Sequence, residues 1–527
     1  MQKISKILSI LGLGLLTFAS CTDLSWKPED GNLTELDAFA NPAAYKQFLA
    51  KLYAGLAVSG QEGPAGKGDI AKIDEGFGQY LRAYWNAQEL PTDEAIIGWS
   101  DQTIADFHDQ DWTSADVFIT SMYYRIFFQV VQCNEFIRQS ADGKLSERGV
   151  PEAQKAEIKA MKADARFLRA LSYWHAIDLF ANVPFVTEEN DLGGIRPVQK
   201  TRAELFTYIE SELKAIETEL PAPKKGEFAR ADQAAAWTLL AKLYMNAEVY
   251  TGQNKYSEAL TYCNKVIASN AYTLQGVHRH LFGADNNKST EIIFQVAYDN
   301  LTRTYGGTKY LMNGAYGGAM SAATYGMADK WGGIRVTNAL VNLYPDDSAK
   351  IDKRSVFFRE GQNKEIAAIG PAFTEGYGFP KFTNVKSDGT FGASVQWPDT
   401  DFPMFRLADV HLMYAEATLR AAAGGNRATA LGYVNAIRAR AYGNATGAIT
   451  DAQLTLNFIL DERARELAWE GHRRTDLIRF GKFSDAGVWP WKGGVKDGKT
   501  TDKIRNIYPI PSADLIANPN LKQNSGY

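Results

Sequence analysis

The feature of this chain that most constrains its fold is a three-and-four spacing of apolar residues, which recurs along most of its length. Between residues 157 and 180 the apolar positions are Ile158, Met161, Ala165, Leu168, Leu171 and Ile177. The same spacing returns in residues 231–250, 256–268, 405–423 and 427–441. Because residues three and four apart share one face of an α-helix, this spacing predicts a series of helices that each bury one apolar face.

The predicted helices come in pairs whose sequences resemble one another. The first helix of a pair carries Leu168-Arg169-Ala170-x-x-Tyr173, Leu240-Ala241-x-x-Tyr244 or Met413-Tyr414-Ala415, and the second carries Tyr256-x-x-Ala259 or Ala428-x-Ala430. Small residues beside large ones, where two helices cross closely, are typical of tetratricopeptide repeats. Stacked pairs bury a continuous core that one pair cannot form alone. We therefore expect a mostly α fold, with degenerate helical repeats at about residues 120–270 and 402–480.

Two stretches of the chain lack this periodicity. Residues 303–335, within a glycine-rich and tyrosine-rich stretch at 275–400, hold eight glycines and five tyrosines or tryptophans. Residues 60–115 are also irregular and contain Trp85, Trp99 and Trp112. A structureless stretch of such length is uncommon in a compact domain unless it has a function. We expect a loop-rich lobe at about 275–400, with both irregular stretches on one side of the helical repeats.

The N-terminus has the pattern of a lipoprotein signal peptide. Lys3 and Lys6 precede an apolar run from Ile7 to Ala19, which is too short to span a bilayer, and the run ends at Ala19-Ser20-Cys21. Small residues before a cysteine indicate cleavage and acylation of Cys21, although an ordinary secretory signal with a chance cysteine is the alternative. The prediction is a signal peptide at 1–20, a polar tether at 21–37 and a single globular unit at 38–527, anchored by lipid because no later apolar stretch is long enough to cross a membrane.

The remaining cysteines and the charge exclude other classes. Cys133 and Cys263 lie in helical sequence and are expected to be buried apolar fillers, with a disulfide between them left open. The formal net charge of the full chain is −4, and cleavage of the signal peptide removes two lysines and thus makes the charge more negative. An acidic chain without a run of basic and aromatic residues is not expected to bind nucleic acid.

Catalytic and metal-binding motifs give no competing function. None of the six histidines forms His-Glu-x-x-His, and there is no Gly-x-Ser-x-Gly or Walker motif. Two acidic stretches, at residues 101–116 and 346–352, match no EF-hand, so we expect no cofactor, with a structural Ca²⁺ left open. Glu462, Glu466 and Glu470 share one helix face near Arg463, Arg465, Arg473 and Arg474. We interpret them as structural ion pairs rather than a catalytic carboxylate pair.

Several sequence blocks together resemble one known family. They are Lys162–Tyr173 with Val183-Pro184, Ala234–Tyr244 with Tyr256–Leu260, Phe402–Val410 with Tyr414–Ala417, Leu460–Gly481, and a C-terminal block from Tyr508-Pro509-Ile510-Pro511 to Tyr527. In this order they resemble the SusD/RagB family of surface lipoproteins of Bacteroidetes. Ala181-Asn182, in place of a Gly-Asp-like pair, and Ser525, where proline is common, are small departures from the family pattern.

The resemblance implies a function without catalysis. It implies an outer-membrane, lipid-anchored binding protein on the cell surface that captures a nutrient, most often a glycan or oligosaccharide. The ligand would pass to a SusC-like TonB-dependent transporter. A peptide ligand, as for RagB-like members, stays open, and a secreted glycoside hydrolase is a third reading. A hydrolase needs two carboxylates about 5–10 Å apart across a cleft.

Aromatic residues in the irregular stretches are the predicted ligand site. Sugar rings offer apolar faces to flat side chains and a hydroxyl rim to polar ones, and glycine-rich loops can expose such side chains. The candidate ligand-binding residues are Trp85, Asn86, Trp99, Tyr305, Tyr316, Tyr325, Trp331 and Arg335. The alternative for each tryptophan is a core position beneath a loop.

Overall fold

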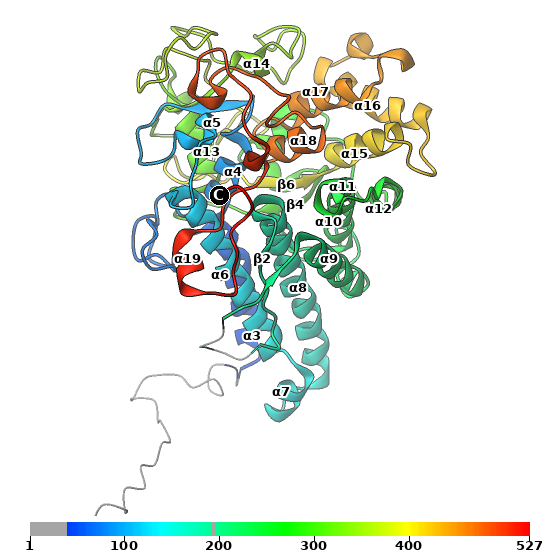
Figure 1. Cartoon of the computed structure of the whole chain (residues 1–527). Coiled ribbons are helices and arrows are strands. Elements are labelled where there is room, and N and C mark those ends of the chain that lie inside the picture. The colour runs from blue at the N-terminus through cyan, green and yellow to red at the C-terminus, as the bar shows by residue number, and fades with distance from the viewer. Residues whose placement is uncertain (1–38, 40, 191–192, 194–195) are drawn as a thin grey trace, which may run out of the picture. The chain divides into compact units, whose positions relative to one another are not determined.

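Helices dominate the residues that the structure describes, which confirms the mostly α fold (Figure 1). The long helices are α3 (Ala43–Ala57), α6 (Val117–Gln139), α8 (Glu152–Phe180), α9 (Arg202–Ile216), α10 (Gln233–Met245), α12 (Tyr256–Ala268), α15 (Leu407–Leu419), α16 (Arg427–Tyr442) and α17 (Leu456–Leu467). Helices that follow one another in the chain pack together: α6 on α8, α8 on α9, α10 on α12, α12 on α15, and α15 on α16. The tetratricopeptide character of these pairs stays a prediction.

The computed structural model describes residues 39, 41–190, 193 and 196–527, and residues 45–527 form one compact unit. The predicted signal peptide at 1–20, the lipidation site Cys21 and the tether at 21–37 lie outside the described residues. Within the described part of the chain, no helix combines the length and apolar character needed to cross a membrane.

Most of the predicted helices lie where the periodicity placed them. The six apolar residues predicted for 157–180 are all buried in α8, and the prediction for 256–268 coincides with α12. Residues 231–250 are divided into α10 and α11 (Ala247–Thr251), because Asn246 ends the first helix and its side-chain amide donates to the Lys242 carbonyl at 2.9 Å.

The described residues form three two-stranded antiparallel sheets, and two of these connect segments that are far apart in the sequence. Strand β1 (Ala95–Ile97) pairs with β5 (Ile334–Val336) and thereby joins the two irregular stretches. Strand β4 (Ile292–Val296) pairs with β6 (Phe402–Arg406), so the start of the helix predicted at 405–423 is a strand and α15 begins only at Leu407. Strand β2 (Val183–Pro184) pairs with β3 (Gln199–Lys200).

The remaining elements are short. The α-helices among them are α4 (Tyr80–Glu89), α5 (Asp106–Asp109), α7 (Asp142–Glu147), α13 (Gly307–Ala315), α14 (Asn338–Val341), α18 (Arg473–Arg479) and α19 (Ser512–Ala517). The 3₁₀ helices are η1 (His278–Phe282), η2 (Asn286–Lys288), η3 (Ala322–Tyr325), η4 (Ala445–Gly447), η5 (Asp451–Gln453), η6 (Lys492–Gly494) and η7 (Lys503–Asn506). In Figure 1, α4, α5, α13 and α14 of the irregular stretches lie together on one side of the long helices.

The two cysteines in this scaffold are free and fully buried, Cys133 in α6 and Cys263 in α12. The disulfide that the sequence left open is therefore not formed. Burial raises the pKa of the Cys133 thiol to about 12, and it also raises the pKa of the Cys263 thiol. Both side chains behave as small apolar fillers, because the reactive thiolate form is disfavoured.

The three glutamates of α17 and the segment after it form a buried ion-pair network, as predicted. Glu462, Glu466 and Glu470 are fully buried. The Arg406 guanidinium donates to Glu466 and Glu470, each at 2.6 Å, and Arg354 donates to Glu462 at 2.8 Å and Glu466 at 3.0 Å. Burial alone raises the pKa of Glu462, but the guanidiniums of Arg354, Arg465 and Arg438 outweigh it and lower that pKa to about 2. The pKa of Glu466 is likewise lowered, chiefly by Arg440 and Arg406 against the effect of burial, so Glu462 and Glu466 stay ionised, as structural ion pairs require.

The partners of these glutamates differ from the nearby arginines expected from the sequence. Of the four expected arginines only Arg465 bonds to a glutamate of the set, Glu462, at 2.8 Å. The other three pair with distant aspartates: Arg463 with Asp409 and Asp476, Arg473 with Asp93, and Arg474 with Asp178. Only Glu462, Arg463, Arg465 and Glu466 lie in α17, whereas Glu470 follows it and Arg473 and Arg474 lie in α18, so tertiary packing chose the partners of these charges.

Two other buried carboxyls, Glu89 and Glu94, have raised rather than lowered pKa values. Glu89 at the end of α4 accepts hydrogen bonds from the backbone of Gly471 and His472, and Glu94 accepts one from Trp469 at 3.0 Å. Burial raises the pKa of both carboxyls, that of Glu94 to about 7, and the charge of Glu94 further raises the pKa of Glu89. The folded chain therefore holds a proton here that the unfolded chain releases near pH 4.5.

This proton gives a pH-dependent stability. A carboxyl with a raised pKa stabilises the fold at low pH, and this contribution is lost as the pH rises from about 4.5 to about 7. We expect Glu94→Gln, which keeps this position neutral, to gain stability relative to the natural chain across that window, by up to about 1.4 kcal/mol per pH unit. Urea unfolding at a series of pH values measures this difference. Glu62→Gln, at an exposed position, serves as control and should give a constant difference. An equally constant difference for Glu94→Gln would contradict the prediction.

Candidate ligand-binding site

Two of the predicted site residues, Trp85 and Asn86, lie in the core and were wrongly expected at the surface. Both belong to α4 and expose none of their surface, because α4 packs against α6, α13 and α18. The Trp85 indole donates to the Trp469 carbonyl at 3.0 Å, and Asn86 accepts from the Tyr310 hydroxyl at 2.7 Å. These side chains have structural partners and offer no face to a ligand.

Tyr316 and Arg335 are also buried, contrary to the expectation. The Tyr316 hydroxyl donates to the Phe382 carbonyl at 2.6 Å. Arg335 lies in β5, and its guanidinium holds the following loop by donating to the carbonyls of Gly370, Ala372 and Glu375 at 2.7 to 3.0 Å. Tyr325 is half-buried and its ring stacks on Tyr316, with centroids 4.8 Å apart. These three residues therefore support the loop-rich lobe from within.

The other three predicted residues, Trp99, Tyr305 and Trp331, are half-exposed and lie close together. The register of β1 with β5 explains why Trp99 lies beside the residues that follow Trp331. Ile97 lies opposite Ile334, and the Gly98 amide donates to the Gly333 carbonyl at 2.8 Å. One residue further, the Trp99 indole donates to the Gly332 carbonyl, next to Trp331. Antiparallel pairing thus brings two irregular stretches to one place on the surface.

Glycine is required at the point where these stretches meet. Gly332 and Gly333 have φ values of +61° and +139°, which side chains with a Cβ rarely adopt. A Cβ at Gly333 would also collide with the indole nitrogen of Trp99. The Gly-Gly pair after Trp331 therefore allows the backbone to approach the Trp99 ring closely, rather than serving only to expose Trp331.

A fourth ring, Trp397, joins this group, although it was not among the residues predicted from the sequence. Its centroid lies 6.1 Å from that of Tyr305 at an interplanar angle of 38°, whereas Trp331 lies 5.9 Å from Tyr305 at 76°. We call Trp99, Tyr305, Trp331 and Trp397 the aromatic cluster. Trp397 lies in the same loop-rich stretch as Tyr305 and Trp331. The signal that indicated those two rings, an aromatic residue in a loop-rich stretch, was therefore present for Trp397 as well.

Lys309 of α13 lies behind three rings of the aromatic cluster. Its ammonium is 4.1 Å from the Trp397 centroid, 5.8 Å from that of Tyr305 and 5.9 Å from that of Trp331. It donates to the Gln396 carbonyl at 2.6 Å and lies 3.8 Å from Asp329. Burial lowers the pKa of Lys309, and Asp329 opposes this change. A cation held over several rings keeps them in place and supports their orientation.

Arg82 of α4 does the same beside Trp99. Its guanidinium lies 4.3 Å from the Tyr310 ring centroid and 5.8 Å from that of Trp99. One of its terminal nitrogens donates to the carbonyls of Gly76, at 2.8 Å, and Tyr305, at 3.3 Å. Burial lowers the pKa of Arg82, while Tyr310 and the carboxylates of Asp101 and Asp74 raise it. Arg82 thus ties the two halves of the aromatic cluster together. Nothing in the local sequence distinguishes Arg82 as a residue of the site.

This arrangement suits a ligand with apolar faces and many hydroxyl groups. The half-exposed rings of Tyr305 and Trp331, at 76° to each other, offer stacking surfaces in different planes. Charged side chains surround them: Asp74 and Asp101 are exposed, Asp329 is half-exposed and Arg82 is half-buried. Carboxylates and guanidiniums accept from and donate to hydroxyl groups, so the surroundings of the aromatic cluster match the rim of a sugar ring.

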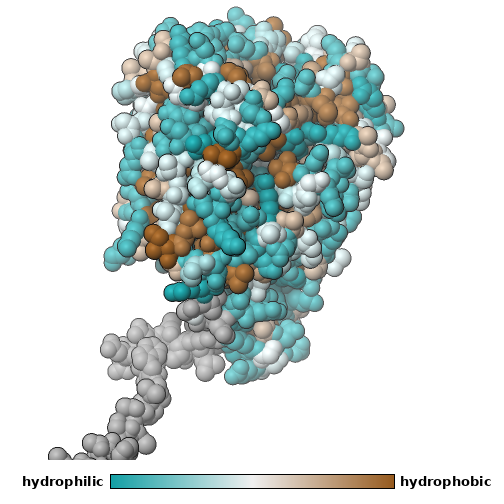
Figure 2. Space-filling view, viewed as in Figure 1, coloured by the Kyte–Doolittle hydropathy of each residue, from teal (hydrophilic) through white to brown (hydrophobic). Residues whose placement is uncertain are grey.

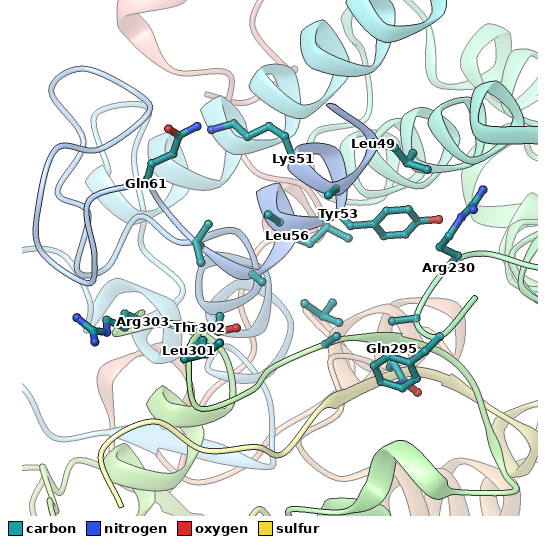
Figure 3. A pocket seen from close by; sticks show the side chains of 18 of the residues that line it. Leu49, Lys51, Tyr53, Leu56, Gln61, Arg230, Gln295, Leu301, Thr302 and Arg303 are labelled. Carbon is teal, nitrogen blue, oxygen red and sulfur yellow. The ribbon is translucent and has the colours of Figure 1, made fainter. Parts of the chain in front are cut away.

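A cavity of about 830 Å³ lies nearby between α3 and residues 295–303 (Figure 3). Leu49 and Leu56 of α3 and Leu301 of the opposite wall contribute apolar surface. Several of its polar groups already have partners. Tyr53, which extends toward Arg230 in Figure 3, donates to Asp164, as does Arg230 itself. These two polar side chains of the cavity lining are therefore already held by the fold.

The acidic stretches do not form a metal site in the described part of the chain. Asp116 caps α6 by accepting from the amides of Phe118 and Ile119. Asp346 accepts from backbone amides of its own loop, and Asp352 pairs with Arg354 at 2.7 Å. Among the described residues, no group of three or more histidines, cysteines or acidic residues is placed to hold a metal ion.

Comparisons with known proteins give consistent matches. A family model described as "SusD family" matches residues 350–527, and another, described as "Starch-binding associating with outer membrane", matches residues 81–245. The "Starch-binding protein SusD" of Bacteroides thetaiotaomicron is 36% identical to this chain, and the match covers 91% of each protein. "SusD-like protein P25" of Formosa agariphila is 27% identical over 71% of this chain and 74% of its own length.

Solved structures show the same fold at lower identity. A SusD superfamily protein from Parabacteroides distasonis has a TM-score of 0.72 at 22% identity and covers 94% of this chain and all of its own. Surface glycan-binding protein A from Bacteroides thetaiotaomicron, solved in complex with laminarihexaose, has a TM-score of 0.70 at 19% identity. It covers 92% of this chain and 99% of its own.

Proposed function

Because this chain belongs to the SusD family, we propose that it is a cell-surface lipoprotein that captures a glycan without cleaving it. In this proposal it passes the glycan to a SusC-like TonB-dependent transporter in the outer membrane. The observation that carries the proposal is the aromatic cluster of Trp99, Tyr305, Trp331 and Trp397. Its rings are half-exposed, contacted by the cations of Lys309 and Arg82 and surrounded by charged side chains, an arrangement that suits a sugar.

The ligand class that we favour is a starch-like α-glucan. The relative that is 36% identical over nearly the whole chain is named a starch-binding protein. The angle of 76° between the Tyr305 and Trp331 rings also suits a chain that curves, as α-1,4-linked glucose does, better than a flat β-1,4-linked ribbon. A peptide ligand is the second candidate, but it would make less use of four clustered rings.

Capture without catalysis is supported by the carboxylates beside the aromatic cluster. Asp74 accepts from the backbone amides of Gly76 and Phe77 at 2.8 and 3.1 Å, and Asp329 lies beside Lys309. A glycoside hydrolase needs a protonated acid facing a second carboxylate across the scissile bond. In this chain the contacts of Asp74 and Asp329 with their own fold give both carboxylates a structural role. The relatives are likewise described as binding proteins.

Calorimetry with a set of oligosaccharides tests this function. We expect maltoheptaose to bind and cellohexaose, with its flat chain, to bind at least about tenfold more weakly, a difference of roughly 1.4 kcal/mol. Laminarihexaose and a mixed peptide library complete the set. Incubation of maltoheptaose with the protein should release no shorter sugars. Binding of peptides alone would favour the second candidate, and release of shorter sugars would refute capture without cleavage.

Localisation at the outer membrane is supported by the family model that matches residues 81–245. We propose that lipid on Cys21 provides the anchor, followed by an acidic tether with Asp23, Glu29 and Asp30. Replacing Cys21 by alanine removes the thiol that is acylated, so the protein should move from the membrane fraction to the soluble fraction. Cell fractionation with an immunoblot measures this, with Cys133→Ala as the matched cysteine control. A Cys21→Ala protein that stays with the membrane would show that the anchor lies elsewhere.

A further inference from the structure

A second apolar surface lies on α6, outside the aromatic cluster. Tyr124, Phe127, Phe128 and Val131 follow the i, i+3, i+4, i+7 spacing that places side chains along one face of a helix. The three rings are half-buried and Val131 is 50% exposed. Other faces of α6 pack against α8 and α4. The helix is therefore apolar on more of its surface than its neighbours in the structure cover.

Residues from other segments extend this surface into a groove. A cavity of about 530 Å³ beside α6 is also lined by Pro184, Val186, Pro197, Ala517 and Leu521. Ile516 in α19 is 86% exposed and Val198 is 63% exposed. Figure 2 shows the hydrophobic colour gathered at the lower left, over α6 and α19. We call these residues of α6, together with Pro197, Ile516 and Leu521, the α6 patch. Contiguous apolar surface of this kind marks interfaces between proteins.

Two polar atoms at the α6 patch have no partner in the described part of the chain. They are the hydroxyl oxygen of Tyr123, whose side chain is only 2% exposed, and one carboxylate oxygen of Asp514. Both residues line the cavity beside α6. Buried polar atoms are almost always hydrogen-bonded in folded proteins. A partner that brings apolar side chains together with a hydrogen-bond donor would satisfy both features of the groove.

The α6 patch also lies near the place where the compact unit begins. Tyr45, the first residue of that unit, donates from its hydroxyl to the carbonyl of Gln139 at the C-terminal end of α6, at 3.2 Å. Only about two dozen residues separate Tyr45 from Cys21, which when extended span at most about 85 Å. If the lipid of Cys21 is inserted in a membrane, the α6 patch is therefore within reach of a protein in the same membrane.

The aromatic cluster adjoins the opposite end of α6. Phe77 packs on Phe118 in the first turn of the helix, at 4.8 Å between centroids, and Arg82 links Gly76 to Tyr305. The 23 residues of α6 span about 35 Å, and the patch occupies the middle of the helix. A partner seated on the α6 patch can therefore leave the rings open to a glycan.

We propose that the α6 patch is the surface on which the transporter docks, through an apolar segment of the transporter that also carries a hydrogen-bond donor. The inference rests on the proposed function, which requires such a partner. A protein fits this surface better than the membrane itself. Surfaces that bind anionic lipid are rich in lysine and arginine, whereas the cavity beside α6 is lined by one arginine, Arg138, and by the carboxylate of Asp514.

A photo-crosslinking amino acid at position 131 tests the contact directly, with the full-length lipoprotein in its native outer membrane. A matched control carries the same amino acid at Val277, which is 52% exposed and lies away from α6. We expect crosslinks from position 131, and not from position 277, to a TonB-dependent barrel identified by peptide mapping. Crosslinks from position 131 only to lipid, or only to a second copy of this chain, would overturn the proposal.

Two substitutions at exposed positions test how much the α6 patch contributes to binding of the transporter. We expect Val131→Glu with Ile516→Glu to reduce recovery of the barrel in mild detergent at least about tenfold, with an unchanged melting temperature and unchanged binding of maltoheptaose. Val277→Glu with Val488→Glu is the control, since both positions are about as exposed as Val131. If the natural chain recovers no barrel, the proposed partner is wrong. If it recovers the barrel and the Val131/Ile516 variant recovers as much, the proposed partner stands and the docking surface is wrong.

Discussion

Replacing Trp331 by alanine is expected to weaken glycan binding by about 10- to 100-fold, which corresponds to roughly 1.4–2.8 kcal/mol. The ring is half-exposed and lies 5.9 Å from that of Tyr305, so it offers a stacking face that alanine cannot replace. Removing a large ring from the centre of a binding surface commonly has effects of this size. We expect a similar loss for Trp99→Ala, measured by calorimetry with the oligosaccharide that binds.

Controls separate binding from folding in this experiment. Trp237→Ala removes another half-buried tryptophan, on α10, and should leave the affinity unchanged. Trp85→Ala removes a fully buried ring and should lower stability by about 3–5 kcal/mol, because it leaves a core cavity. If Trp331→Ala and Trp99→Ala both keep full affinity and an unchanged melting temperature, the aromatic cluster is not the binding site.

Replacing Arg406 by glutamine is expected to destabilise the chain by about 3–5 kcal/mol, because it removes one cation from three buried carboxylates, which keep only Arg354, Arg440 and Lys381 as partners. Arg406 is 1% exposed and donates to Glu291, Glu466 and Glu470 at 2.6–2.8 Å. These contacts join strand β6, the segment before β4 and the end of α17. The loss should therefore lower the melting temperature of the whole unit and its yield of folded protein.

An exposed ion pair provides the matched control for this substitution. Arg427 pairs with Asp451 at 2.7 Å, but their side chains are 44% and 64% exposed. Solvent screens such pairs, so Arg427→Gln should cost at most about 1 kcal/mol. Thermal unfolding of both variants measures the contrast. Equal shifts for Arg406→Gln and Arg427→Gln would show that burial does not set the strength of the network around α17.

Much of the helical fold was predictable because helices depend on local spacing. The apolar residues of α8 and the limits of α12 were read from three-and-four periodicity alone. The same reasoning placed Phe405 and Arg406 in a helix, where the structure has strand β6. Pairing with β4, more than a hundred residues earlier, overrides the local pattern there, and no local signal reports such a pairing.

The candidate site was predictable only in part, because it too depends on contacts between residues that are far apart in the sequence. Glycine-rich loops with aromatic residues indicated the right stretches, and they contained Trp99, Tyr305 and Trp331. Trp85 and Tyr316 have the same residue types and similar surroundings in the sequence, yet they are fully buried. Exposure of a ring depends on which helices and loops pack over it. That packing is a property of the whole fold and not of the local stretch.

The sequence by itself determined the class of this protein: its helical scaffold, its family and the charged residues of α17. The tertiary structure alone decided which partners those charges have and which rings reach the surface together. The register of β1 with β5 brings Trp99 beside Trp331 across more than two hundred residues. Helix periodicity and family motifs are local patterns that a chain carries in its residue order. Long-range pairing is set by the free energy of the folded whole, so it is visible only in three dimensions.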